Sequence, residues 1–153
     1  MRNPQSDYWA RKCCEKVRGL PLWVAATHIA WGGQCALQCA DCGGPLRAHH
    51  ILGRPKRLRY NLRNLMLLCE DHHAGNAGWW GHAKGRQMIP ALQSQYPELV
   101  EWIQVIAPML DNHAWLQGWD WEMDYLTLKA VLAKENDYIG TCRALGVRET
   151  ENE

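Results

Sequence analysis

The spacing of apolar and polar residues predicts four helical segments along the chain. In the clearest of them, apolar side chains recur every three or four positions on one face, and Pro97 suits the first turn. Gly32 and Gly33 mark the end of an earlier helix, and Asp120 is a candidate N-cap for the last one. The predicted helices cover residues 7–19, 22–31, 97–106 and 121–135.

The middle of the chain shows a different pattern, with short apolar runs between turns. Residues 46–52 are predicted to form a strand. Residues 64–68 form a short apolar run, and a helix is expected to begin after this run. These patterns together predict an α+β fold with flanking helices and a mostly helical C-terminal half. The expected segments are 1–34 (helical), 35–86 (core), 87–147 (helical) and 148–153 (a flexible tail).

Charge is distributed unevenly, although the formal net charge is +1. Residues 1–86 hold 13 basic and 5 acidic side chains, a net +8, whereas residues 87–153 hold 4 basic and 11 acidic ones, a net −7. A basic half joined to an acidic half indicates polyanion binding by the first half. A solvated surface with uneven charge explains the same numbers, and composition alone leaves both interpretations open.

Cysteine usage indicates metal binding in a reducing compartment. The first residues are too polar for a secretion signal, and the longest mostly apolar run, residues 20–31, is far shorter than the ~20 residues that a membrane span needs. A cytoplasmic protein with no membrane partner is therefore expected. In such a compartment paired cysteines more often hold metal than form disulfides. Four of the seven cysteines lie outside the metal pattern described next: Cys13, Cys14, Cys35 (a spare ligand candidate) and Cys142.

Two ligand pairs have the spacing of a structural zinc site. Cys39 and Cys42 are separated by two residues, as are Cys69 and His72. Each pair can converge on one ion from a single turn, and three thiolates with one imidazole suit tetrahedral zinc. The adjacent His73 could replace His72 as the fourth ligand. A lone Cys-x₂-Cys is weak evidence, but two such pairs in order are specific.

A second group of polar residues lies between and beside these pairs. His49 and His50 are adjacent, so on a strand their side chains point to opposite faces, and one could bind a metal while the other faces a substrate. His73 could reach the same ion as His49. Asn64 lies between the two histidine groups, either as a hydrogen-bonding residue or as a simple turn or cap residue.

In these residues the chain resembles the HNH, or ββα-metal, nucleases, over about residues 36–76. The resemblance is carried by Cys39, Cys42, His49, His50, Asn64, Leu65, Leu68, Cys69 and His73. It departs at His72, because the family usually has cysteine there. A looser likeness to phage recombination endonucleases of the NinG/Rap type rests on residues 39–43 and 58–64 and on a lysine-containing helix near residues 126–134.

The resemblance implies a division of roles. His49 and His73 would bind a catalytic divalent ion, with Mg²⁺ or Mn²⁺ favoured over Zn²⁺, and His50 would accept a proton from the attacking water. Asn64 would either hold the backbone that aims His50 or complete the metal shell. A basic loop beside this cluster would neutralise DNA phosphates. Its residues are Arg54, Lys56, Arg57, Arg59 and Arg63.

The expected function is that of a metal-dependent DNA endonuclease acting in a bacterial or phage-infected cell. A structure-selective resolvase of branched DNA is one alternative, and a zinc-finger DNA-binding module without catalysis is another. The acidic C-terminal helices could pack on the core, form a homodimer or dock another protein. Trp79 and Trp80 could stack on unpaired bases, although packing in a helical core is the commoner fate of neighbouring tryptophans.

Overall fold

The computed structural model describes residues 4–17, 19–53, 58–73, 88–111 and 121–134. These residues form helices and two small antiparallel sheets, so the predicted α+β class is confirmed. Several sequence predictions lie outside the described residues and concern the basic loop, the tryptophan pair and single side chains. They are those for Arg54, Lys56, Arg57, Trp79, Trp80, Asp120 and Cys142.

A two-stranded antiparallel sheet lies at the centre. Strand β3 (Leu46–His50) pairs with β4 (Leu65–Cys69), with Leu46 opposite Cys69 and His50 opposite Leu65. All five residues of β4 are buried, which explains its unbroken apolar sequence. The short helix α3 (Glu70–His73) follows β4 directly, so the predicted order of strand, apolar segment and helix is confirmed.

One face of β4 packs against helices from the C-terminal half. These are α4 (Met88–Gln93) and α5 (Pro97–Ile106), and α5 continues into the 3-10 helix η4 (Ala107–Asp111). Met66 and Leu68 of β4 share a buried cluster with Leu92 and Val100. The bounds of α5 agree with the predicted helix 97–106, and Pro97 occupies its first turn.

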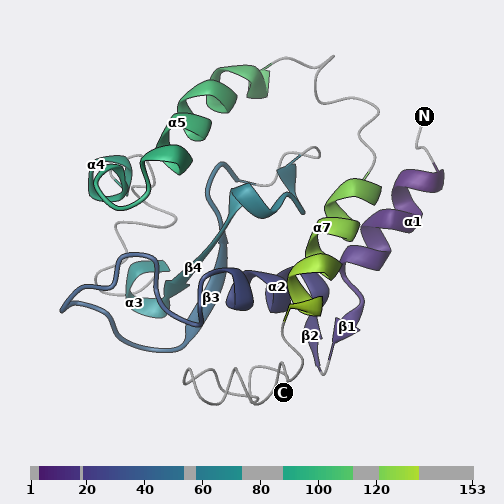
Figure 1. Cartoon of the computed structure of the whole chain (residues 1–153), viewed down its shortest axis with the longest axis horizontal. Helices are drawn as coiled ribbons and strands as arrows, with labels where there is room; N and C mark the ends of the chain where they lie inside the picture. Colours follow the sequence, from purple (N-terminus) through teal and green to yellow (C-terminus); the bar gives the residue numbers. More distant parts are fainter. Residues whose placement is uncertain (1–3, 18, 54–57, 74–87, 112–120, 135–153) are drawn as a thin grey trace.

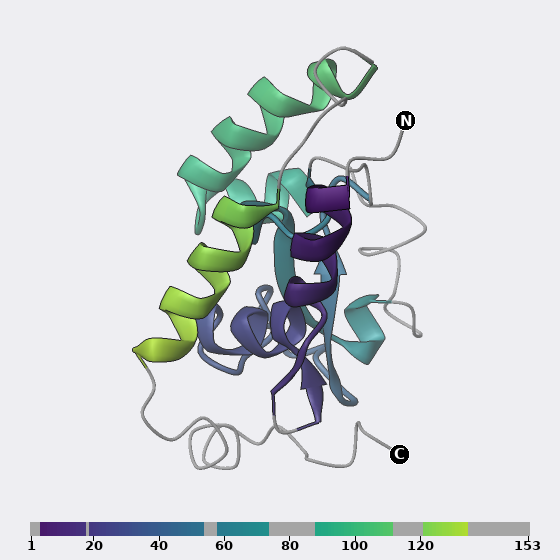
Figure 2. The same cartoon turned by 90° about the vertical axis from the view of Figure 1, so that its right-hand side faces the viewer.

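Three further helices pack on the other side of the strand pair. Helices α1 (Pro4–Cys13), α2 (Leu22–Ala30) and α7 (Glu122–Ala133) contact one another, and both views show α7 alongside α1 (Figure 1 and Figure 2). The 3-10 helix η2 (Leu62–Asn64) leads into β4 and also contacts α2 and α7. The cluster that joins them includes Leu22, Leu65, Trp121 and Leu128. Described residues from all three expected segments, 1–34, 35–86 and 87–147, therefore meet in this cluster.

The predicted helix 7–19 is longer than the helix that forms. Helix α1 ends at Cys13, and a small hairpin follows, made of β1 (Lys16–Val17) and β2 (Leu20–Pro21). Gly19 lies in the turn with φ +93°, a conformation that glycine adopts without steric cost. Among the described residues, no helix is long and apolar enough to cross a membrane.

His28 on α2 gives the fold a pH dependence. Its side chain is 1% exposed, and burial lowers its pKa from 6.5 to about 4. The unfolded chain therefore binds a proton between pH 6.5 and pH 4 that the folded protein excludes, so stability falls as the pH falls through this window. We expect a loss of up to about 3 kcal/mol by pH 4 from this residue.

Urea unfolding of wild type and His28→Gln at pH 7 and pH 4.5 checks this prediction. Acid also weakens metal binding, but in both proteins alike, so the difference between the two proteins isolates the histidine. The advantage of wild type over the variant should shrink in acid. An equal difference at both pH values would contradict the assignment.

Candidate functional site

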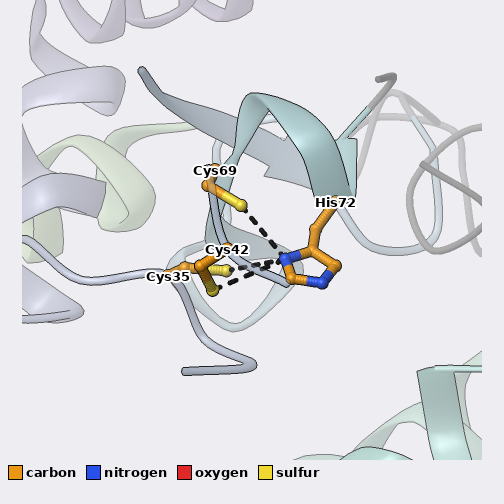
Figure 3. Close-up of side chains that lie close together, drawn as sticks. All are labelled: Cys35, Cys42, Cys69 and His72. Atoms are coloured by element: carbon orange, nitrogen blue, oxygen red, sulfur yellow. Dashed lines mark hydrogen bonds between the residues drawn. The ribbon is translucent and has the colours of Figure 1, made fainter. Parts of the chain in front are cut away.

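Three thiols and one imidazole converge at the end of the central sheet. The sulfurs of Cys69, Cys35 and Cys42 lie 3.0, 3.6 and 3.6 Å from Nδ1 of His72. The four ligand atoms all lie within 4.8 Å of one another. Figure 3 shows the three sulfurs gathered around one nitrogen of the imidazole ring.

This donor set fits a tetrahedral zinc ion. With Zn–S bonds of about 2.3 Å and a Zn–N bond of about 2.0 Å, sulfur and nitrogen ligands of one ion lie about 3.5 Å apart. The three sulfur–nitrogen distances bracket this value. Cys35, Cys69 and His72 are buried, as the ligands of a structural site usually are. The cluster could therefore hold a structural metal such as zinc.

Backbone hydrogen bonds bring these ligands together from three parts of the chain. Ala36 donates its N–H to the carbonyl of Leu67 at 2.8 Å, which fixes Cys35 beside β4. The N–H groups of Glu70 and Asp71 donate to the carbonyls of Pro45 and Gly43, which attaches the loop after Cys42 to the start of α3. Cys69 and His72 are already close, because they are three residues apart across the first turn of α3.

The structure gathers Cys35, rather than the predicted Cys39, with Cys42, Cys69 and His72. Cys39 is exposed, and its sulfur lies 3.4 Å from Nε2 of His72, on the other side of the ring from the converging sulfurs. The reason is the turn between the two cysteines, in which Gln38 donates to the carbonyl of Cys35 and has φ +43°. The Cys-x₂-Cys spacing could not reveal a turn that depends on contacts with β4.

The surroundings of Cys42 disfavour the ionised form of its thiol. Although Cys42 as a residue is exposed, packing around its sulfur, together with the neighbouring Cys35 and Cys69, raises the pKa of its thiol to about 12. A divalent cation reverses this preference, because a coordinating thiol gives up its proton. Metal binding at this cluster would therefore release protons.

The two adjacent histidines on α3 have different neighbours. His72 belongs to the thiol cluster, whereas the ring of His73 lies 5.3 Å from that of His49, with the ring planes 77° apart. His49 on β3 is buried, and His73 is partly exposed. The predicted proximity of His49 and His73 is therefore found, and the structure places His72 rather than His73 among the thiols.

His50 points to the opposite face of β3. Its Nε2 lies 2.9 Å from the carbonyl oxygen of Arg59, and its ring centroid lies 4.9 Å from that of Trp23 on α2. A carbonyl oxygen can only accept, so the neutral ring carries its proton on Nε2. Sequence reasoning missed Trp23, which reads as an ordinary apolar helix residue.

Asn64 is a fully buried hub for the loop that follows β3. Its Oδ1 accepts from the N–H of Leu52 at 2.8 Å, and its Nδ2 donates to the carbonyls of Gly53 and Leu58 at 3.0 and 3.1 Å. Both ends of the loop that leads to Arg59 are thus attached to one side chain. These contacts favour a role for Asn64 in holding the backbone near His50 over a role in the metal shell.

Two of the predicted DNA-binding arginines lie among the described residues. Arg63 is exposed on η2, and Arg59 is partly buried. Both belong to the segment between β3 and β4, the same segment whose backbone contacts His50.

Comparisons with known proteins identify no relative. No protein-family model, curated protein or solved structure matches this chain.

Proposed function

We propose that this protein is an HNH-type, metal-dependent DNA endonuclease. One observation carries the proposal: β3, β4 and α3 bring His49 and His73 into contact, while the adjacent His50 is held by the carbonyl of Arg59. The thiol cluster lies at the start of α3 and anchors the same helix that supplies His73. Three imidazoles with different partners suit different chemical roles.

His50 is the proposed general base. Its proton on Nε2 is donated to the carbonyl of Arg59, so the lone pair lies on Nδ1, and this nitrogen would accept the proton of the attacking water. Imidazole suits this role, because its ordinary pKa lies near neutrality. The contact with Trp23 limits rotation of the ring.

His49 and His73 are the proposed ligands of the catalytic ion. Two imidazoles in contact, one from a strand and one from a helix, can share one divalent ion while leaving positions for water and phosphate. An ion bound there, Mg²⁺ or Mn²⁺ in our proposal, would supply Lewis-acid stabilisation of charge on the leaving oxygen. Arg63 and Arg59 would position the DNA backbone beside these rings.

Plasmid nicking with added Mg²⁺ or Mn²⁺ tests the proposal. We expect wild type to nick supercoiled DNA and His50→Ala to be slower by about 10²–10⁴-fold, because general-base help is typically worth that much. His28→Gln is the matched control, since it removes a buried histidine on α2 and should keep the wild-type rate at pH 7.5. Equal zinc content and a fully folded state at the assay temperature must be shown for all three proteins.

Two outcomes would overturn the proposal. If His50→Ala cleaves as fast as wild type, the assigned base is wrong. If wild type binds DNA but does not nick it with either ion, the chain is better described as a zinc-dependent binding module. Comparing linear, nicked and four-way substrates at one salt concentration then separates a general nuclease from a resolvase of branched DNA.

A further inference from the structure

Four thiols lie close to His72, but a tetrahedral zinc ion with one histidine ligand binds only three of them. His72 presents Nδ1 to the sulfurs of Cys35, Cys42 and Cys69, at 3.0–3.6 Å, and Nε2 to the sulfur of Cys39 at 3.4 Å. The two ring nitrogens lie on opposite sides of the imidazole, so one ion cannot bind both. Cys39 therefore needs a different role from the other three thiols.

The chemistry of imidazole supplies that role. A histidine that binds a metal through Nδ1 carries its remaining proton on Nε2, and metal-bound histidines almost always donate this proton to a neighbouring acceptor. His72 is 1% exposed, so water has little access to its ring. The Cys39 sulfur lies within hydrogen-bonding distance of Nε2 and can accept the proton.

Chain geometry also favours Nδ1 as the ligand atom. Cys69 and His72 are separated by two residues at the start of α3, so only a short side-chain reach is needed between them. Nδ1 is the ring nitrogen nearer the backbone, and it lies 3.0 Å from the Cys69 sulfur, the shortest of the three contacts. The far nitrogen, Nε2, then points outward toward the exposed Cys39.

We infer that the metal centre uses Cys35, Cys42, Cys69 and Nδ1 of His72, and that Cys39 is a positioning residue that accepts the Nε2 proton of the bound histidine. Cys35 is the ligand because its backbone is fixed beside β4, whereas Cys39 is held outside by the turn at Gln38. Outer partners of this kind typically alter metal affinity by about 10–100-fold when they are removed.

Cobalt substitution of the full-length protein distinguishes the two cysteines. The sulfur-to-cobalt charge-transfer band grows with the number of bound thiolates. We expect Cys39→Ser and Cys39→Ala to keep the band of a three-thiolate site, and Cys35→Ser to lose about one third of it. Chelator competition should show a fall in zinc affinity of about 10–100-fold for Cys39→Ala and a smaller one for Cys39→Ser, because the serine oxygen can still accept the Nε2 proton.

A second measurement keeps the assignment testable if Cys35→Ser does not fold. ¹⁵N NMR of the zinc-loaded wild type should show His72 bound through Nδ1 and protonated at Nε2. Metal bound at Nε2, or a cobalt band that shrinks in Cys39→Ser, would overturn the assignment. An unchanged zinc affinity in Cys39→Ala would show that Cys39 does not act on His72. Neither measurement depends on DNA cleavage.

Discussion

Removing the metal is expected to unfold the segment around the thiol cluster and to lower stability by as much as about 10 kcal/mol, since structural zinc contributes on that order in small folds. Nearly every residue from 38 to 45 is exposed. That segment buries no apolar side chain of its own, and a few backbone hydrogen bonds attach it to α3. Only the ligand bonds can then supply the missing stability.

Circular dichroism and urea unfolding with and without a strong chelator measure this effect. Cys69→Ser should reproduce chelation, because it removes a buried ligand at the end of β4. Cys14→Ser is the matched control, since Cys14 is exposed, lies outside the cluster and instead contacts the hydroxyl of Tyr60 at 3.2 Å. The control should keep one zinc per cluster and the wild-type midpoint. A chelated protein that unfolds at the wild-type urea concentration would show that the cluster carries no structural metal.

Asn64→Ala is expected to have the second largest effect, a loss of about 3–5 kcal/mol. The substitution removes three hydrogen bonds, one buried and two partly buried, and leaves the N–H of Leu52 and the carbonyls of Gly53 and Leu58 without their partner. Each lost bond in a buried site is worth about 1–3 kcal/mol when its partner stays unsatisfied. If the proposed function is correct, cleavage should also slow, because the loop that carries the Arg59 carbonyl would no longer be fixed against His50.

Two neighbouring substitutions show whether the effect belongs to this hub. Asn64→Asp keeps the acceptor for Leu52 but places a carboxylate against two carbonyl oxygens, so it should be at least as destabilising as alanine. Asn61→Ala removes a partly buried amide on the same turn whose oxygen accepts from the N–H of Arg63, and it should lose about 1 kcal/mol. Equal urea midpoints for the Asn61 and Asn64 variants would contradict the assignment of Asn64 as the hub of this loop.

Measuring the folded fraction and the cleavage rate of Asn64→Ala together tests this hub further. If Asn64 acts by positioning, Asn64→Ala should lower the cleavage rate at temperatures where circular dichroism shows the protein fully folded. If the rate falls only in proportion to the unfolded fraction, Asn64 contributes stability alone.

The local sequence was sufficient for elements whose pattern is decided within a few residues. The helix at 97–106 follows from its apolar face and its first-turn proline. The opposite directions of His49 and His50 follow from the alternation of a strand, and the pairing of Cys69 with His72 follows from one helical turn. Each of these depends on short-range geometry alone.

The tertiary structure decided everything that depends on contacts between distant segments. Cys35 entered the thiol cluster because Ala36 bonds to Leu67, thirty-one residues away, and no spacing rule encodes that contact. The hairpin after α1 replaced the end of a predicted helix because the chain must turn back to start α2. Likewise, His50 met Trp23 and the Arg59 carbonyl only because α2 and the loop pack on the same face of β3. Side-chain chemistry thus determined which groups were available, and long-range packing decided which of them meet.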